Sequence, residues 1–188
     1  VSKSIDVSFS VSKDSLDTLS SLFNVTIDKR CSFAIWTTTP WTLPSNVAVC
    51  INPKLDYSLV EGNGECFVIA SELIDSCVSR WGFDLKELSK IKGDLFQDIN
   101  LDHPFLERQS QLLKGAHVTT DAGTGCVHTA PAHGLDDYFI CKDNNIEPIK
   151  ALNNQGFFRD EYEDIAGLPA FKADPFILKT ISDNKTLI

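Results

Sequence analysis

The sequence predicts a β-rich α+β domain, and three observations lead to that class. Short stretches of alternating apolar and polar residues recur along the chain, as in half-buried strands. Turn-forming residues such as Asn63-Gly64 separate several of these stretches. Only a few segments have apolar residues at helical spacing. Many short strands with a few helices between them favour a closed or nearly closed β-barrel core with peripheral helices.

Most of the predicted strands lie in the first half of the chain. They are expected over residues 5–11, 33–36, 47–51, 57–60 and 66–70, and the last two would form a hairpin through Gly62-Asn63-Gly64. A helix beginning near Ser12 or Asp14 would place its leucines and Phe23 on one face. A second helix is expected from Ser71 to Trp81, because Gly82 is suited to end it.

The second half of the chain continues the mixed pattern. Strands are expected over residues 86–96, 111–119 and 127–129, with a turn at His103-Pro104. A helix is expected over residues 135–142, followed by a hairpin that turns near residues 153–156. Asp174 would cap a final helix that has Pro175 at its first position. No repeat, low-complexity tract or linker divides the chain, so residues 1–188 are expected to form a single domain.

The composition is that of a globular protein, with 43% hydrophobic and 23% charged residues. No run approaches the ~20 apolar residues that a membrane-spanning helix needs. The six cysteines are scattered without a Cys-x-x-Cys pair, which favours reduced, mostly buried thiols in a cytoplasmic protein. The absence of methionine indicates that the chain is a fragment of a longer protein.

Threonine hydroxyls and an asparagine amide gather in the segment Trp36-Thr-Thr-Thr-Pro-Trp-Thr-Leu-Pro-Ser-Asn46. Pro40 and Pro44 exclude a regular helix or a central strand there. Threonines are good strand residues, so the run could be purely structural. The prolines, however, bend the backbone so that hydroxyl and amide groups can converge on a ligand.

About ninety residues later, the segment Gly123-Thr-Gly-Cys-Val-His-Thr-Ala-Pro-Ala-His-Gly-Leu-Asp-Asp-Tyr138 carries two histidines and a pair of aspartates. Adjacent acids at the start of a helix are commonly solvated residues that the helix dipole favours. A single histidine in a strand, such as His128, is more often a hydrogen-bonded core residue than a catalyst. His133 could simply shape the turn at Gly134.

Together the two segments resemble the editing domain (connective peptide 1) of isoleucyl-tRNA synthetases, in the class I aminoacyl-tRNA synthetase family. Where valyl and leucyl relatives carry Thr-Thr-Arg-Pro, this chain reads Thr37-Thr38-Thr39-Pro40 followed by Trp41. The resemblance covers essentially the whole chain. It implies a barrel-centred domain whose ends lie close together, because the domain is inserted into a nucleotide-binding catalytic domain.

The resemblance also implies roles for the second segment. Asp137 would hold the α-ammonium group of the bound aminoacyl moiety through a charge-assisted hydrogen bond. Asp136 would only begin the helix. His128 would line the amino-acid pocket and help to exclude the longer isoleucine.

The first segment would cradle the terminal adenosine and the ester carbonyl. Its implied catalytic residues are Thr38 and Thr39, which would act with Asp137, and its implied substrate-binding residues are Trp36, Thr37, Thr42 and Asn46. Polar donors aimed at the developing oxyanion would be the main catalytic device.

The implied function is hydrolytic proofreading of valine wrongly attached to isoleucine tRNA. Water would attack the ester with help from the vicinal ribose hydroxyl, and isoleucine would be sterically excluded. The implied partners are the 3′ end of the mischarged tRNA, its valine moiety and the rest of the synthetase in cis, with no membrane. No metal or cofactor is expected; ATP and magnesium would serve the catalytic domain, whose His-Ile-Gly-His and Lys-Met-Ser-Lys-Ser segments this chain lacks.

Other chemistries have weaker support in the sequence. His128, His133 and Asp137 could be metal ligands, but proline and glycine separate them. Cys126 could be a thiol nucleophile, although a histidine two residues away on a strand is rarely placed for proton transfer. Gly123-Thr-Gly-Cys lacks the Gly-Lys-Ser/Thr ending of a phosphate loop.

The alternative function is a non-catalytic β-barrel module that binds a small ligand or a partner chain. The two functions differ in one geometric requirement. Editing requires that the segment 37–46, His128 and Asp137 line one cavity.

The net charge of −9 predicts that this chain binds whole tRNA weakly, because 26 acidic residues outnumber 17 basic ones and repel phosphates. A short 3′-terminal aminoacyl fragment should still bind through hydrogen bonds, with little dependence on salt. The full enzyme should show a steep salt slope contributed by its other domains. Titration of the chain with whole tRNA at several salt concentrations is the measurement. Tight binding with a steep slope would reveal a basic surface that the composition hides.

Overall fold

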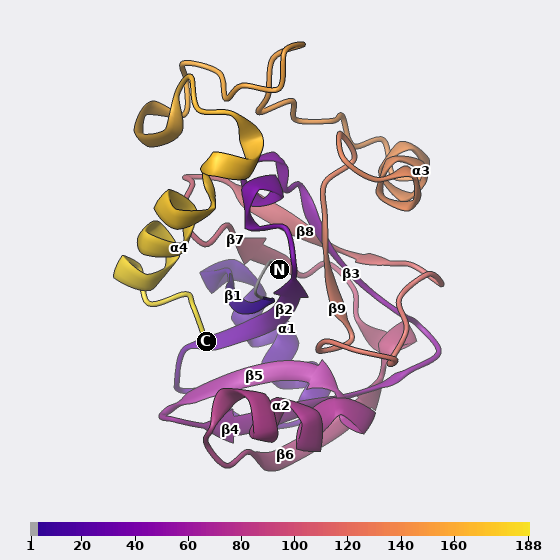
Figure 1. The fold of residues 1–188 in the computed structure, drawn as a ribbon. Coiled ribbons are helices and arrows are strands. Elements are labelled where there is room, and N and C mark those ends of the chain that lie inside the picture. Colours follow the sequence, from indigo (N-terminus) through magenta and orange to yellow (C-terminus); the bar gives the residue numbers. More distant parts are fainter. Residues whose placement is uncertain (1–3) are drawn as a thin grey trace.

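The computed structural model describes residues 4–188, which form one nine-stranded mixed sheet with helices around it (Figure 1). The first three residues of the predicted single domain lie outside the described ones. The strands are β1 (Ile5–Val11), β2 (Cys31–Thr37), β3 (Ala48–Ile51), β4 (Asp56–Gly62), β5 (Glu65–Ala70), β6 (Lys86–Lys92), β7 (Asn100–Asp102), β8 (Gln109–Lys114) and β9 (Cys126–Thr129). The α-helices are α1 (Lys13–Phe23), α2 (Ile74–Trp81), α3 (Leu135–Asp143) and α4 (Asp174–Asp183). Short 3₁₀ helices are η1 (Pro40–Ser45), η2 (Ser71–Leu73), η3 (Gly93–Leu95), η4 (Glu163–Ile165) and η5 (Ala170–Lys172).

The β-rich α+β class is confirmed, but the predicted closed or nearly closed barrel is wrong. The strand order is β6-β4-β5-β2-β1-β7-β8-β3-β9, and within residues 4–188 the edge strands β6 and β9 share no ladder. Every residue of β6 is at least partly exposed, and the strand carries Lys86, Lys90 and Lys92. Lysines on an edge strand discourage further pairing. The sheet therefore ends at β6 instead of closing.

The sheet nevertheless curls so that the approach to β9 packs against β5. The Ala70 N–H donates to the Thr124 carbonyl at 2.8 Å, and the Cys126 thiol lies 3.6 Å from the Val68 carbonyl. Two parallel pairs, β2 with β5 and β3 with β8, interrupt the otherwise antiparallel sheet. This curl brings the second polar segment of the sequence next to the first.

An aromatic cluster around Phe96 fills the main core. The Phe96 ring meets Phe23, Phe33 and Tyr57 edge to face, at centroid distances of 5.8, 5.5 and 5.7 Å. None of these four side chains is more than 2% exposed. Such pairs contribute ~0.5–1.5 kcal/mol each beyond the burial of their area. Phe96 follows η3, so the strand predicted over residues 86–96 ends at Lys92.

The turn and helix-end signals are confirmed where glycine or asparagine adopts a positive φ. Asn63 and Gly64, with φ of 51° and 81°, connect β4 and β5 in the two-residue loop that Asn-Gly favours. Gly82 ends α2 with φ of 76°. The helix predicted from Ser71 begins as the separate 3₁₀ helix η2.

Several predicted boundaries are wrong in the second half of the chain. Strand β8 ends at Lys114 rather than at residue 119, and the short strand β7 was not predicted. The hairpin expected near residues 153–156 is reduced to isolated bridges, one of them between Leu152 and Phe158. Asp174 lies inside α4, where its carboxylate accepts the Trp41 N–H at 3.0 Å instead of capping the helix.

The C-terminal end of the chain pairs with β1, as expected for a domain whose ends lie close together. Val7 and Leu187 form an antiparallel bridge. The Ser8 N–H donates to the Thr186 carbonyl at 2.7 Å, and the Ile188 N–H donates to the Asp6 carbonyl at 3.0 Å. The two ends of the described chain therefore lie close together at β1.

All six cysteines are free and buried, as their scattered spacing predicts. None of the helices in residues 4–188 combines the length and the apolar character that crossing a membrane requires.

Tyr57→Phe should lower the free energy of unfolding by about 1–3 kcal/mol, because it leaves buried backbone groups unpaired. The Tyr57 hydroxyl donates to the Gly125 carbonyl at 2.6 Å and accepts the Asn52 N–H at 2.8 Å. Urea denaturation measures the change. Tyr138→Phe is the matched control, because the Tyr138 side chain is 41% exposed. Equal stability of the two variants would contradict the assigned role of the Tyr57 hydroxyl.

Candidate active site

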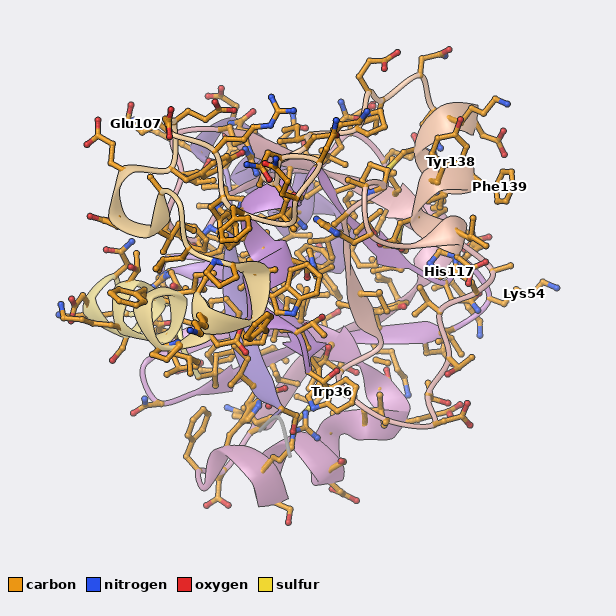
Figure 2. All side chains as sticks on the ribbon, turned by 45° about the horizontal axis from the view of Figure 1, so that its top comes forward. Trp36, Lys54, Glu107, His117, Tyr138 and Phe139 are labelled. Carbon is orange, nitrogen blue, oxygen red and sulfur yellow. The ribbon has the colours of Figure 1, made fainter. Side chains whose placement is uncertain are left out.

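One cavity of about 400 Å³ brings the two polar segments together. Its lining residues are Trp36, Thr37, Thr38, Thr39, Thr42, Thr119, Asp121, Ala122, Val127, His128, Ala130, His133 and Asp137. They come from the end of β2, from η1, from β9 and the start of α3, and from the loop before β9. Figure 2 shows Trp36 beside the loop that leads into β9. Residues far apart in the sequence, among them Thr39, His128 and Asp137, therefore line one cavity.

The proline-containing segment forms a six-residue 3₁₀ helix, η1, rather than an irregular loop. Pro40 occupies a first position, where a helix leaves an N–H unpaired in any case. The Thr42 N–H donates to the Thr39 carbonyl at 3.0 Å, and the Asn46 N–H to the Leu43 carbonyl at 2.9 Å. The prolines thus exclude a regular α-helix but permit this tighter turn, which directs the Thr42 side chain toward β9.

The His128 ring joins η1 to β9 through both of its nitrogens. Nδ1 lies 2.8 Å from the Asn46 amide nitrogen, and Nε2 lies 2.8 Å from the Thr42 hydroxyl. The Asn46 amide also donates to the Ala48 carbonyl at 2.8 Å, while its oxygen accepts the Ser110 hydroxyl at 2.6 Å. The amide nitrogen must donate to Nδ1, so the proton of the neutral ring is on Nε2 and is donated to Thr42. Thr42 in turn donates to the Thr39 carbonyl at 2.8 Å.

Burial keeps this imidazole uncharged. Desolvation, followed by the neighbouring His133, lowers the pKa of His128 to about 3. Both nitrogens are occupied by protein groups, so the ring has no free lone pair for a proton or a metal ion. His128 therefore shapes and orients the cavity and does not act as a base.

Asp137 lies in the first turn of α3, with its carboxylate between the helix and β9. Its Oδ2 accepts the Ala130 N–H at 2.8 Å, and the carboxylate lines the cavity. Burial raises the pKa of Asp137, an effect that this hydrogen bond partly opposes. The neighbouring Asp136 is exposed and does not line the cavity. Only the second acid of the pair is thus placed to meet a ligand.

The three consecutive threonines divide into a structural and an accessible group. Thr37 is buried, and its hydroxyl accepts the Thr39 N–H at 3.1 Å. Thr38 and Thr39 are exposed at the cavity. Of these three threonines, Thr38 and Thr39 therefore have hydroxyls that a bound molecule can reach.

Two other residues named by the sequence analysis occupy supporting positions. Asn46 is fully buried behind His128 and does not line the cavity, so its predicted contact with substrate is replaced by a contact with the His128 ring. His133 does line the cavity, with Nε2 3.0 Å from the Ser45 hydroxyl and its ring edge to face with Trp41. Burial lowers the pKa of His133, so the ring is neutral near pH 7.

The wall formed by Thr119, Asp121 and Ala122 was not predicted from the sequence. These residues fall in a stretch of turns and bends between β8 and β9, where the sequence pattern predicted a strand up to residue 119. The available signal was Gly123, whose φ of 83° suits a sharp turn that glycine adopts easily.

Thiol and metal chemistry have no support in this geometry. The Cys126 thiol is buried against the Val68 carbonyl, and burial raises its pKa well above the ordinary value, which keeps it protonated. Within residues 4–188, no three His, Cys, Asp or Glu side chains are grouped to hold a metal ion.

Comparison with known sequences finds relatives over the whole chain. Isoleucine–tRNA ligase of Legionella pneumophila (strain Paris) is 39% identical over 188 residues, which cover all of this chain and 20% of that protein. Isoleucine–tRNA ligase of Dichelobacter nodosus is 42% identical over 189 residues, again covering all of this chain and 20% of that protein. The chain thus spans about one fifth of these relatives' length. No protein-family model matches it.

Comparison with solved structures gives the fold. The chain resembles the crystal structure of GlLeuRS-CP1 with a TM-score of 0.80 at 15% identity, covering 99% of this chain and 98% of that one. It resembles the P. falciparum cytosolic leucyl-tRNA synthetase editing domain with a TM-score of 0.71 at 14% identity, covering 98% of each. The nine-stranded sheet with its helices is therefore the fold of these CP1 editing domains.

Asp137→Asn should raise the melting temperature at neutral pH, because it removes a partly desolvated charge while an amide oxygen can still accept the Ala130 N–H. The raised pKa means that the folded state binds a proton more tightly than the unfolded state does. Stability therefore falls as pH rises from the ordinary carboxyl value, about 3.9, through the raised one. Thermal melts between pH 3 and 8 should show the gain at high pH and its loss at low pH. The exposed control Asp136→Asn should show no gain; an equal gain would contradict the effect of burial.

Proposed function

Since the chain is homologous over its whole length to isoleucine–tRNA ligases and has the fold of CP1 editing domains, we propose that it is the editing domain of such a ligase. It hydrolyses the ester that joins valine to isoleucine tRNA. Its partners are the 3′ end of that tRNA and the remainder of the ligase in the same cytoplasmic polypeptide. The domain spans the chain from residue 1 to residue 188.

The single observation that carries this proposal is the shared cavity of about 400 Å³. Its volume is in the range of small-molecule sites and suits an aliphatic side chain together with part of a nucleoside. It presents the carboxylates of Asp121 and Asp137, the accessible hydroxyls of Thr38, Thr39 and Thr119, and an apolar wall. A binding module with η1 as a mere structural corner would not require these groups to converge.

Asp137 supplies the anchor for the α-ammonium group. One of its oxygens is committed to the Ala130 N–H, which fixes the direction of the carboxylate. The remaining oxygen can accept a charge-assisted hydrogen bond from the amine in a partly dry site. This contact orients the ester toward the threonine hydroxyls.

Water performs the attack, and neither His128 nor Cys126 supplies the nucleophile or the base. His128 is neutral with both nitrogens bonded, and the Cys126 thiol is buried and protonated. The hydroxyls of Thr38 and Thr39, which line the cavity, donate to the ester carbonyl as negative charge develops on it. The vicinal hydroxyl of the terminal ribose assists the attacking water. No metal or cofactor takes part.

Selection of valine over isoleucine follows from the rigid wall at His128. Isoleucyl-tRNA synthetase is itself the established example of the underlying limit: one methylene provides only about 1–3 kcal/mol of discrimination, so a second and smaller site must hydrolyse the valine product. A ring held at both nitrogens cannot rotate away to admit the longer side chain. Val127 and Trp36 extend the wall.

Asp137→Ala should reduce hydrolysis of the valyl ester by roughly tenfold to over a hundredfold, the equivalent of losing a charged hydrogen bond of ~1.5–3 kcal/mol. The measurement is deacylation of valine-charged isoleucine tRNA by the full-length ligase. Asp136→Ala is the control and should retain most of the activity, since Asp136 lies outside the cavity. Full activity of Asp137→Ala would reject the assignment.

His128→Ala should widen the cavity and raise hydrolysis of correctly charged isoleucine tRNA more than that of valine-charged tRNA. The substitution also leaves Thr42 and Asn46 without their shared partner, so rates should be compared at equal intervals below each melting temperature. A variant that still spares isoleucine would place the excluding wall elsewhere, with Trp36 as the next residue to test.

A further inference from the structure

Arg80 connects the cavity wall to the place where the two chain ends meet. It lies in the last turn of α2, and its guanidinium grips the Asp6 carboxylate with two hydrogen bonds, Nε to Oδ2 at 2.9 Å and Nη2 to Oδ1 at 2.8 Å. Nη2 also donates to the Gly123 carbonyl at 3.1 Å, and Nη1 to the Ser76 hydroxyl at 3.1 Å. One side chain thus joins α2, β1 and the loop before β9.

The Gly123 bond belongs to a series that fastens this loop. Three consecutive carbonyls are each held from a different element: Gly123 by Arg80 of α2 at 3.1 Å, Thr124 by the Ala70 N–H of β5 at 2.8 Å, and Gly125 by the Tyr57 hydroxyl of β4 at 2.6 Å. The contacts of the Thr124 and Gly125 carbonyls lie at the end of the loop that continues into β9. Arg80 holds the end of the series that faces the cavity, directly after Asp121 and Ala122.

Gly123 also fixes the position of Trp36. A Cβ placed on Gly123 would lie 3.1 Å from the Trp36 Cβ, so the loop backbone rests directly on this side chain. Trp36 is opposite Asp6 in the β1–β2 ladder. The loop, Trp36 and Asp6 therefore pack together, and the hydrogen bonds of Arg80 to Asp6 and Gly123 connect them.

Asp6 gives this group its link to the chain ends. The Asp6 residue is only 6% exposed, and its carbonyl accepts the N–H of Ile188 at 3.0 Å. A displacement of the ends relative to the sheet would act on Asp6 and, through Arg80, on the loop that lines the cavity.

We propose that Arg80 is a positioning residue that holds residues 119–123 and Trp36 at the cavity in register with Asp6. The planar fork of arginine matches both carboxylate oxygens and still has a donor for the Gly123 carbonyl, whereas the ammonium group of lysine is a point charge. The proposal rests on the proposed editing function for its catalytic consequence. Its structural consequence can be measured without that function.

The test compares Arg80→Lys, Arg80→Ala and Asp6→Asn with Arg30→Ala in the full-length ligase. Arg30 is a matched control: its side chain is 31% exposed against 28% for Arg80, and it also ties the C-terminal segment down, through the Lys185 carbonyl at 2.8 Å. It donates to Ser10 and pairs with Glu65, and it does not line the cavity. The first readout is hydrogen exchange of the Ala70 and Cys126 amides, which donate to the Thr124 carbonyl and hydroxyl directly after Gly123. The second is hydrolysis of 2′(3′)-O-valyl-adenosine at equal intervals below each melting temperature.

Both Arg80 variants should lose exchange protection at Ala70 and Cys126 and lose about ten- to a hundredfold in kcat/KM, since a misplacement of about 1 Å can cost about 10²-fold. Arg80→Lys should behave like Arg80→Ala, because a charge alone does not replace the hydrogen bonds of the guanidinium group. The exchange and the rate of Asp6→Asn should be intermediate between those of the Arg80 variants and the wild type. Arg30→Ala should keep both properties even if its melting temperature falls as far. Arg80 variants that match Arg30→Ala in exchange and in rate would overturn the proposal.

The two proposals fail in different ways. A wild-type ligase that does not hydrolyse the valyl ester would reject the editing function, while the exchange data would still decide the role of Arg80. An active wild-type ligase with unchanged exchange and hydrolysis in the Arg80 variants would reject the positioning role alone.

Discussion

Two hydrogen bonds to the His128 ring join β9 to the 3₁₀ helix that follows β2. They connect residues 82 and 86 positions apart, and the groups on both sides are almost fully buried. In such surroundings an unpaired polar atom costs about 1–3 kcal/mol, so the network is stable only when complete. Asn46 illustrates this completeness, because its amide nitrogen serves the Ala48 carbonyl and His128 while its oxygen accepts from Ser110. The cavity exists because this polar core fixes the distance between the two segments.

The same network separates the buried groups of the site from the groups that a ligand can reach. Buried groups that hold one another have no capacity left for a ligand, and they provide the rigid wall. Groups at the cavity surface, namely the Thr38 and Thr39 hydroxyls and the second oxygen of Asp137, retain free hydrogen-bonding capacity. In the proposed editing reaction, selectivity by size and stabilisation of developing charge therefore belong to different residues. The buried side chains give the cavity a rigid wall, and the accessible side chains are free to form hydrogen bonds with a ligand.

Local signals in the sequence were sufficient for the parts of the fold that local chemistry determines. Asn63-Gly64 specified the hairpin, and Gly82 the end of α2, because both need positive φ. Closure of the sheet was predicted wrongly because it depends on whether β6 and β9 meet, which no local pattern encodes. The accessible cavity residues were predicted because two sequence segments resemble those of a known family. The wall at Thr119, Asp121 and Ala122 could not be found in that way, since tertiary bonds to Arg80, Ala70 and Tyr57 fasten the loop that follows it.

The position of Asp137 shows how the site reconciles a buried charge with an acidic protein. A net charge of −9 raises the cost of another partly buried carboxylate, and burial already raises the pKa of this one. The Ala130 N–H offsets part of that cost and leaves one oxygen free. An ammonium group would offset more, because it supplies the missing positive charge as well as donors. A cationic amine would thus stabilise this carboxylate more than a neutral or anionic group would.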